Sequence, residues 1–292
     1  MSPAAPAAPT VIAVLDESGP RLCDPAEPLV RADDLAVLRG EGVFETARVA
    51  GGRAFVLDEH LARMRVSAAA VELTLPAKAD LLAVCTCALD AFGPSEASLR
   101  IVATKGPATG AGVVFALASG VGTDYAAARA QGIAAVTLAL GVPAGLRPSA
   151  PWLLGGIKST SYATAMAGLR AATAAGGDDA IWVSSDGEVL EAPTSTVLVV
   201  RGGQACTPPA DQIGVLPGTT VAALGSAVAR RRIAAAELAD ADEIGLASSI
   251  RGVVPVVSLD GRPVAGGAVG PVIAALRDGF EAAFWASAPP LG

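Results

Sequence analysis

One lysine carries the strongest chemical signal in this chain. Lys158 lies in the segment LGGIKSTSY (154–162), and only two other lysines occur, Lys78 and Lys105. An amine can lose its proton and attack a carbonyl carbon, whereas a guanidinium stays protonated and cannot. A lysine beside two glycines, in a chain whose basic charge is otherwise carried by arginine, therefore indicates a chemical role. The alternative is a solvated lysine at the start of a helix.

Two further segments follow Lys158 in order. Glu191 comes 33 residues later, in the segment DGEVLEAPTST (186–196), and Pro217 of the segment LPGTT (216–220) comes a further 26 residues on. A carboxylate pairs with a cation, and backbone N–H groups at a helix start bind anions. Taken alone, Glu191 is an ordinary exposed acid at a strand end. The order of the three segments therefore matters more than any one of them.

Mixed strands and helices must position these residues. At 292 residues the chain is long enough for two lobes, each with a core of its own. Apolar patterns predict strands at 11–15, 43–49, 53–57, 99–103, 113–118, 133–140, 179–183, 189–191, 196–201, 243–247 and 255–259. Helical patterns predict helices at 59–71, capped by Asp58, and at 80–92, 162–175, 217–233 and 272–285, with a turn at 33–38. Because strands and helices do not alternate strictly, the expected fold class is α+β with two lobes.

Local composition divides the chain into four parts. Residues 1–10 are rich in Pro and Ala and predict a disordered tail. The run GVGT at 120–123 predicts an interlobe linker, assigned to residues 121–126. A small N-terminal lobe is then expected at 11–120 and a larger lobe at 127–292.

Charge and composition argue against several classes of protein. A net charge of −7 disfavours a nucleic-acid partner, and the one basic run, Arg230-Arg231-Arg232, is interpreted as the solvated end of a helix. One histidine and four cysteines without paired spacing disfavour a metal site. The sequence contains no stretch of eighteen apolar residues, so no membrane-spanning helix is predicted. Residues 1–10 lack the features of a signal peptide. A cytoplasmic protein with reduced cysteines is expected.

The three segments, together with GEGVFET (40–46) and EHLARM (59–64), resemble the fold-type IV pyridoxal-phosphate enzymes, the class IV aminotransferases. The resemblance extends over roughly residues 11–284. The family contains branched-chain aminotransferases, D-amino acid aminotransferases and aminodeoxychorismate lyases. It implies a small N-terminal α/β lobe, a larger lobe with a mixed sheet that binds pyridoxal 5'-phosphate, and a homodimer with active sites near the subunit contact.

The resemblance also implies roles for individual residues. Lys158 is the lysine that forms a Schiff base with the cofactor and moves a proton, and Glu191 is the carboxylate that keeps the ring nitrogen protonated. Tyr162 resembles the tyrosine that, in some members, hydrogen-bonds the phenolic oxygen of the cofactor. The phosphate group is assigned to Arg63, Thr219, Thr220, Ser248 and Ser249.

Each of these residues also has an ordinary structural interpretation. Arg63 is then a solvated side chain on an amphipathic helix, and Ser248 and Ser249 form a turn. Tyr162 then only packs at the lobe interface. His60 is interpreted as a structural rather than a catalytic residue.

Within the family, the segment GIKSTSY (156–162) resembles the form common in aminodeoxychorismate lyases, and the chain looks most like the actinobacterial members of that branch. The resemblance implies elimination of pyruvate from 4-amino-4-deoxychorismate to give 4-aminobenzoate, a folate precursor; the alternative is a D-amino acid or branched-chain aminotransferase. Arg100 is a candidate contact for a substrate carboxylate, or else a structural arginine at a strand end. Two departures from the family pattern, Ser195-Thr196 and Val221, weaken the substrate assignment more than the cofactor assignment.

Three other classes of protein fit less well. A nucleotide-binding P-loop needs a glycine immediately before its lysine, where this chain has Ile157. Serine–lysine acyl transfer needs a serine three residues before a lysine, and none occurs. A non-catalytic binding protein on the same scaffold remains an alternative.

Overall fold

The computed structural model describes residues 10–122 and 124–287. The predicted tail at residues 1–10 therefore lies outside the described residues, except for Thr10, which begins the first strand. The chain divides into two compact units: an N-terminal unit, residues 1–122 with 285–292, and a C-terminal unit, residues 123–284. Residues 124–126 of the predicted linker belong to a helix, α4 (Asp124–Gln131). In the described part of the chain, no helix is both long and apolar enough to cross a bilayer.

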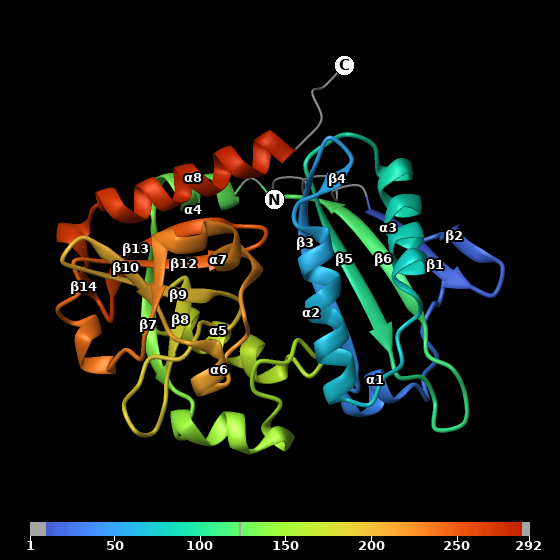
Figure 1. Cartoon of the computed structure of the whole chain (residues 1–292), viewed down its shortest axis with the longest axis horizontal. Coiled ribbons are helices and arrows are strands. Elements are labelled where there is room, and N and C mark those ends of the chain that lie inside the picture. The colour runs from blue at the N-terminus through green and yellow to red at the C-terminus, as the bar shows by residue number, and fades with distance from the viewer. Residues whose placement is uncertain (1–9, 123, 288–292) are drawn as a thin grey trace, which may run out of the picture. The chain divides into compact units, whose positions relative to one another are not determined.

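The N-terminal unit is built on a six-stranded antiparallel sheet of order β2-β1-β6-β5-β3-β4. Its strands are β1 (Thr10–Asp16), β2 (Gly19–Cys23), β3 (Gly42–Ala50), β4 (Arg53–Ala54), β5 (Ala97–Thr104) and β6 (Val114–Gly120). Its helices are α1 (Leu35–Arg39), α2 (Leu57–Ala70) and α3 (Lys78–Phe92). The helices α2 and α3 lie over one face of this sheet (Figure 1).

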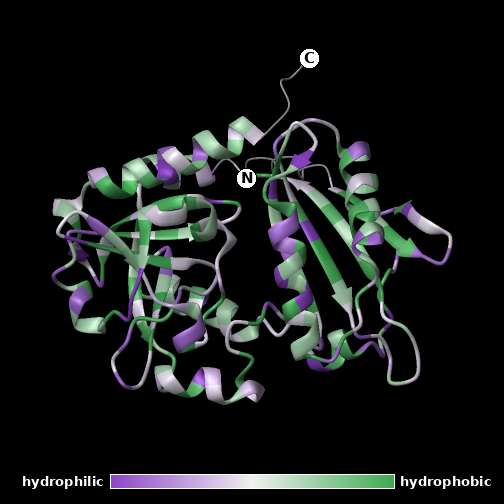
Figure 2. Cartoon of the chain, viewed as in Figure 1, coloured by the Kyte–Doolittle hydropathy of each residue, from purple (hydrophilic) through white to green (hydrophobic). Residues whose placement is uncertain are grey.

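Strand alternation decides which side chains meet those helices. Side chains at every second position of β3 and β5, among them Val43, Val49, Leu99 and Ile101, share a buried core with Leu61 and other residues of α2 and α3. Glu45 lies opposite Ile101 in the sheet and is fully buried. Figure 2 shows the contrast between the largely hydrophobic strands β5 and β6 and the many hydrophilic residues of α2.

The entry into α2 differs from the expectation. Asp58 does not cap the helix, because α2 begins at Leu57 and Asp58 already lies in its first turn, where an acidic side chain favours the helix dipole. The capping position is taken by Val56, whose backbone is left-handed, with φ 45° and ψ 42°. A β-branched residue rarely adopts this conformation, which costs about 1–3 kcal/mol. The predicted turn at 33–38 is also corrected: Asp34 caps the short helix α1 by accepting a hydrogen bond from the Ala36 N–H.

The C-terminal unit contains a mixed eight-stranded sheet of order β11-β10-β9-β12-β13-β7-β8, with β14 paired to β13. Its strands are β7 (Ile133–Ala139), β8 (Asp179–Val183), β9 (Thr196–Arg201), β10 (Gln204–Thr207), β11 (Val228–Arg230), β12 (Glu243–Ser248), β13 (Gly252–Leu259) and β14 (Arg262–Pro263). The α-helices are α4, α5 (Ala163–Ala174), α6 (Ala210–Ile213), α7 (Thr219–Leu224) and α8 (Pro271–Ser287), which belongs to this unit as far as Phe284. Short 3₁₀ helices lie at η1 (Ala144–Ser149), η2 (Pro151–Leu153), η3 (Gly225–Ala227), η4 (Ala235–Leu238) and η5 (Ala265–Gly267).

The prediction of one long helix over 217–233 was wrong. The helix α7 ends at Leu224, and Gly225, with φ 59°, turns the chain. Residues 228–230 then form β11, which pairs in parallel with β10 at the edge of the sheet. Local helical spacing was overridden by pairing with a strand some twenty residues earlier in the chain.

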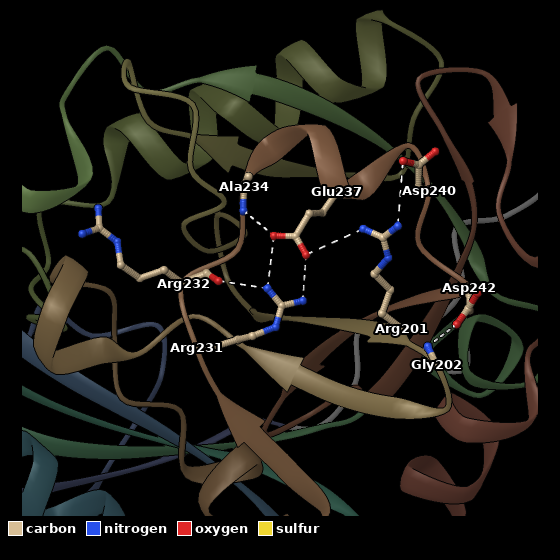
Figure 3. A network of polar contacts seen from close by, with 8 residues as sticks. All are labelled: Arg201, Gly202, Arg231, Arg232, Ala234, Glu237, Asp240 and Asp242. Carbon is tan, nitrogen blue, oxygen red and sulfur yellow. Dashed lines mark hydrogen bonds and ion pairs between the residues drawn. The ribbon is translucent and has the colours of Figure 1, made fainter.

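The basic run that follows is likewise not the end of a helix. Arg231 donates two hydrogen bonds to the Glu237 carboxylate, of 3.1 and 2.8 Å, and Glu237 also accepts from the Ala234 N–H (Figure 3). Arg232 donates from Nε to Glu188, at 2.7 Å. These arginines therefore join separate segments of the C-terminal unit.

Candidate functional site

The loop that carries Lys158 is held against the segment 214–216. Gly156 adopts a left-handed backbone with φ 78°, which favours glycine. A Cβ atom on Gly156 would come within 3.0 Å of the Val215 carbonyl oxygen, and one on Gly155 within 2.7 Å of the Gly214 carbonyl oxygen. The two glycines before the lysine therefore allow the two backbones to approach closely. Lys158 itself is partly buried.

Glu191 attaches to the same segment from another element. It follows the turn after β8, whose Trp182 N–H donates to the Glu191 carbonyl oxygen at 2.8 Å. The strand predicted at 189–191 is reduced to an isolated bridge between Val183 and Val189. In its carboxylate, Oε2 accepts from the Leu216 N–H at 3.0 Å and Oε1 from Nη2 of Arg147 at 3.2 Å. The segment 214–216 thus contacts both the loop of Lys158 and the carboxylate of Glu191, which are 33 residues apart in sequence.

Tyr162 lies beside the lysine. The Lys158 Nζ is 5.6 Å from the centroid of the Tyr162 ring, within the range of a cation–π interaction. Tyr162 is also the residue that precedes α5. The phenol and the amine therefore occupy one neighbourhood.

Hydroxyl groups gather at the start of α7. The Thr219 Oγ1 and the Ser249 Oγ are 3.4 Å apart, at hydrogen-bonding distance. A Cβ atom on Gly218 would collide with the Thr196 Oγ1, so glycine leaves room for this threonine. Thr196 in turn pairs with Ala247 in the sheet, at the end of β12. The other two hydroxyl residues predicted for the phosphate are the sequence neighbours of Thr219 and Ser249: Thr220 is buried in α7, and Ser248 is the last residue of β12.

An arginine that was not predicted as a site residue contacts the segment that follows Glu191. The Nη2 of Arg251 donates to the Ser195 Oγ at 2.6 Å and to the buried carboxylate of Asp179 at 2.5 Å. Ser195 therefore ties the chain after Glu191 to the turn between β12 and β13. Arg251 stands in the segment IRGVVPV (250–256), but nothing local in the sequence indicates its partners.

In the N-terminal unit, Arg63 belongs to a buried ionic cluster. Its Nε and Nη2 donate to the two carboxylate oxygens of Glu45, at 2.6 and 2.7 Å. The Nδ1 of His60 is 2.6 Å from the Oε2 of Glu45. Burial of Glu45 alone would raise its pKa, but the hydrogen bonds from Arg63 and His60 outweigh this effect and lower the pKa to about 2. The carboxylate is thus ionised and accepts only, so His60 carries a hydrogen on Nδ1.

Arg100 lies in the same unit, on β5. It is exposed, and its guanidinium carbon is 5.3 Å from the centroid of the Phe44 ring. This cation–π contact gives the side chain a structural partner. Its role toward a substrate stays a prediction.

Five of the predicted site residues thus lie in the C-terminal unit, in segments joined through residues 214–220 or through direct contacts: Lys158, Tyr162, Glu191, Thr219 and Ser249. Arg63 and Arg100 belong to the N-terminal unit. The sequence did not predict Arg147, Arg251 or Asp179, because each acts through a partner more than forty residues away. No group of three or more His, Cys, Asp and Glu side chains in residues 10–122 and 124–287 could hold a metal ion.

A profile of the family "Amino-transferase class IV" matches residues 42–259. The chain belongs to this family. The match covers both the segment of Glu45 and Arg63 and the whole run from Lys158 to Ser249, so the sequence resemblance is confirmed. It also makes the molecule an enzyme of the class IV aminotransferase family.

Individual relatives agree with the family match. The chain is 38% identical, over 88% of its length and 95% of the relative, to a bifunctional aminodeoxychorismate lyase / D-amino acid transaminase from Mycobacterium tuberculosis. A fold IV transaminase from Curtobacterium pusillum superposes with a TM-score of 0.85 at 35% identity, covering 95% of this chain and 97% of that one. A hypothetical aminotransferase from M. tuberculosis, in its PLP-bound form, superposes with a TM-score of 0.86 at 35% identity, covering 95% and 99%. The predicted α+β fold of the fold-type IV enzymes is therefore confirmed.

Family membership also confirms the predicted cofactor, pyridoxal 5'-phosphate. The side chains present fit its chemistry. Lys158 supplies an amine, Glu191 a carboxylate with room for a further donor, and Thr219 and Ser249 two adjacent hydroxyl groups.

Proposed function

We propose that this protein is an aminodeoxychorismate lyase, which eliminates pyruvate from 4-amino-4-deoxychorismate and releases 4-aminobenzoate. The observation that carries the proposal is the 38% identity, over nearly the full length of both chains, to a relative named for this activity. The segment GIKSTSY (156–162), which resembles the lyase branch, also supports it. The same relative is also named a D-amino acid transaminase, so transamination of D-amino acids is the second candidate.

Lys158 performs the covalent and proton-transfer chemistry in this proposal. Its amine would hold the aldehyde carbon of pyridoxal phosphate, and as a free amine it would remove the proton from C4 of the substrate. When bound, the cofactor supplies an electron-accepting ring. Lys158 then donates the proton to the methylene carbon of the departing enolpyruvyl group, which gives pyruvate. The remaining ring becomes aromatic, so no keto-acid acceptor is required.

The other residues bind and orient. Glu191 holds the proton of the ring nitrogen, and Tyr162 hydrogen-bonds the phenolic oxygen. The phosphate group is bound by Thr219, Thr220, Ser248 and Ser249 and by Arg63 of the N-terminal unit. Arg100 is proposed to contact a substrate carboxylate. These roles are carried over from the family motifs, residue by residue.

We further propose that the protein acts as a homodimer in the cytoplasm and supplies 4-aminobenzoate to folate synthesis. These three statements follow from the resemblance to the lyase branch.

The interlobe linker is proposed at residues 121–126.

Turnover of 4-amino-4-deoxychorismate tests the proposed reaction. The purified protein with pyridoxal phosphate is expected to form pyruvate and 4-aminobenzoate in equal amounts without any keto acid. Lys158→Ala is expected to lower the rate at least about 10³-fold, because the first proton transfer loses its base and the second its acid. Activity that requires a D-amino acid and a keto acid, with no 4-aminobenzoate formed, would establish the transaminase instead.

A further inference from the structure

Arg147 is the side chain that contacts the carboxylate of Glu191. It lies in the 3₁₀ helix η1, and its side chain is 12% exposed. Its Nη2 is 3.2 Å from the Oε1 of Glu191, while the Leu216 N–H holds the Oε2 at 3.0 Å. The two carboxylate oxygens thus have different partners from different segments, and together these partners determine the plane of the carboxylate.

The surrounding backbone is shaped to accommodate this arginine. A Cβ atom on Gly155 would come within 3.1 Å of the Arg147 Cβ and 3.2 Å of its Nε. A Cβ atom on Gly214 would come within 2.7 Å of the Arg147 Cβ. All three distances are shorter than ordinary van der Waals contact. The stem of Arg147 therefore passes between the loop that leads to Lys158 and the segment that contacts Glu191.

The hydrogen bonding of the arginine is incomplete. Its Nη1 is buried and has no hydrogen-bond partner among the described residues. A buried donor left unsatisfied costs about 1–3 kcal/mol, and native proteins leave few such groups. The 3.2 Å contact with Glu191 is also long for a charge-assisted hydrogen bond, which is commonly 2.7–2.9 Å. A buried arginine with these features contributes little to folding through its hydrogen bonds.

We propose that Arg147 is a positioning residue for the cofactor: it holds the Glu191 carboxylate in the orientation that accepts the ring N–H of pyridoxal phosphate. This inference rests on the proposed function. A carboxylate has about four acceptor sites, so Oε1 and Oε2 each keep one for the ring nitrogen after binding Arg147 and Leu216. Without the arginine, the terminal torsion of the glutamate is broad, and the carboxylate samples orientations that miss the ring.

The test compares Arg147→Met and Arg147→Lys with Arg232→Met. The control variant removes the ion pair between Arg232 and Glu188. Glu188 lies only three residues before Glu191 in the chain. The dissociation constant of pyridoxal phosphate is measured from its visible absorbance, and the pH dependence of the bound cofactor's spectrum is recorded. R147M is expected to weaken binding about tenfold and to shift the spectral titration, R147K to do so about threefold, and R232M to stay within twofold of the wild type.

A double-mutant cycle separates positioning from a general effect on the fold. In a Glu191→Gln background, R147M is expected to weaken binding less than threefold, because its effect passes through the carboxylate that is already changed. An equal loss in both backgrounds, or wild-type affinity and spectra in R147M, would overturn the inference while leaving the proposed function intact. If R147M does not fold, R147K decides by the same comparison. A wild-type protein that binds no pyridoxal phosphate would overturn the proposed function and this inference together.

Discussion

Two arginine–glutamate pairs, one in each unit, differ in how completely the carboxylate is satisfied. Glu45 is fully buried, and it receives two hydrogen bonds from Arg63 and one from His60, all between 2.6 and 2.7 Å. Glu191 is 20% exposed, and it receives one backbone N–H at 3.0 Å and one arginine contact at 3.2 Å. The two side chains are chemically identical, so the difference in their hydrogen bonding comes from their surroundings.

The comparison shows two uses of a carboxylate: one is fully hydrogen-bonded within the protein, and the other keeps acceptor sites for a ligand. The acceptor sites of Glu45 are taken by fixed partners, and its charge is balanced inside the N-terminal unit. Glu191 keeps acceptor capacity, and its arginine keeps an unpaired nitrogen. The Glu45 cluster joins β3 to α2 and fixes the side chain of Arg63, whereas the carboxylate of Glu191 keeps acceptor sites that a ligand can use.

Removing each carboxylate should separate these uses most clearly. Glu45→Ala leaves Arg63 and His60 buried without their counter-ion, so the free energy of unfolding is expected to fall by about 3–5 kcal/mol. Glu191→Ala removes two weaker contacts and is expected to cost about 1 kcal/mol. Urea denaturation of both variants without cofactor measures the two losses. Losses of equal size would remove the distinction drawn between the pairs.

Acid should also weaken the Glu45 cluster. The pKa of Glu45 is lowered to about 2 in the folded protein, so its contribution is complete above the ordinary pKa of about 4.5 and is lost as the pH falls toward 2. The contribution is about 3 kcal/mol. Relative to Glu45→Gln, the wild type should therefore lose more stability between pH 5 and pH 3 in urea denaturation. Parallel pH profiles for the two proteins would contradict the assigned pKa.

A smaller change should reach Glu191 through its arginine without altering any charge. Gly155→Ala places a methyl group against the stem of Arg147 and the Gly214 carbonyl, and is expected to cost about 1–3 kcal/mol and to weaken pyridoxal phosphate binding. Gly145→Ala is the matched control, because no atom lies within 4 Å of its Cβ position, and it should change stability by less than about 0.5 kcal/mol. Thermal unfolding and cofactor titration of both variants compare them. Identical behaviour would show that the glycine does not constrain the arginine.

The sequence predicts the parts of this molecule that depend on local patterns. The alternation in β3 and β5 and the helical spacing in α3 and α8 identify those elements within a few residues. The helix expected over 217–233 fails because pairing of β11 with β10 is not encoded locally. Asp58 fails as a cap because the helix is entered two residues earlier, at Val56.

In the candidate site, too, the sequence predicts the residues that stand in local motifs and misses those that are brought together only by the fold. The motifs around Lys158 and Glu191 are readable because their residue types carry the chemistry. The residues that orient them are not readable, because Arg147 is joined to Glu191, and Arg251 to Asp179, only by the fold. Glu45 stood within a segment that supported the resemblance, yet its pairing with Arg63 depends on how α2 packs on β3.

The left-handed backbone at Val56 has a consequence for how this enzyme can vary. Successive residues of an α-helix are rotated by about 100° around its axis, so one residue gained or lost before α2 would turn Arg63 and His60 away from Glu45. The short connection between β4 and α2 therefore sets the angular phase of the helix as well as its direction. Among natural variants, insertions and deletions should be rarer here than in the turn between β1 and β2, whose length controls no buried charge.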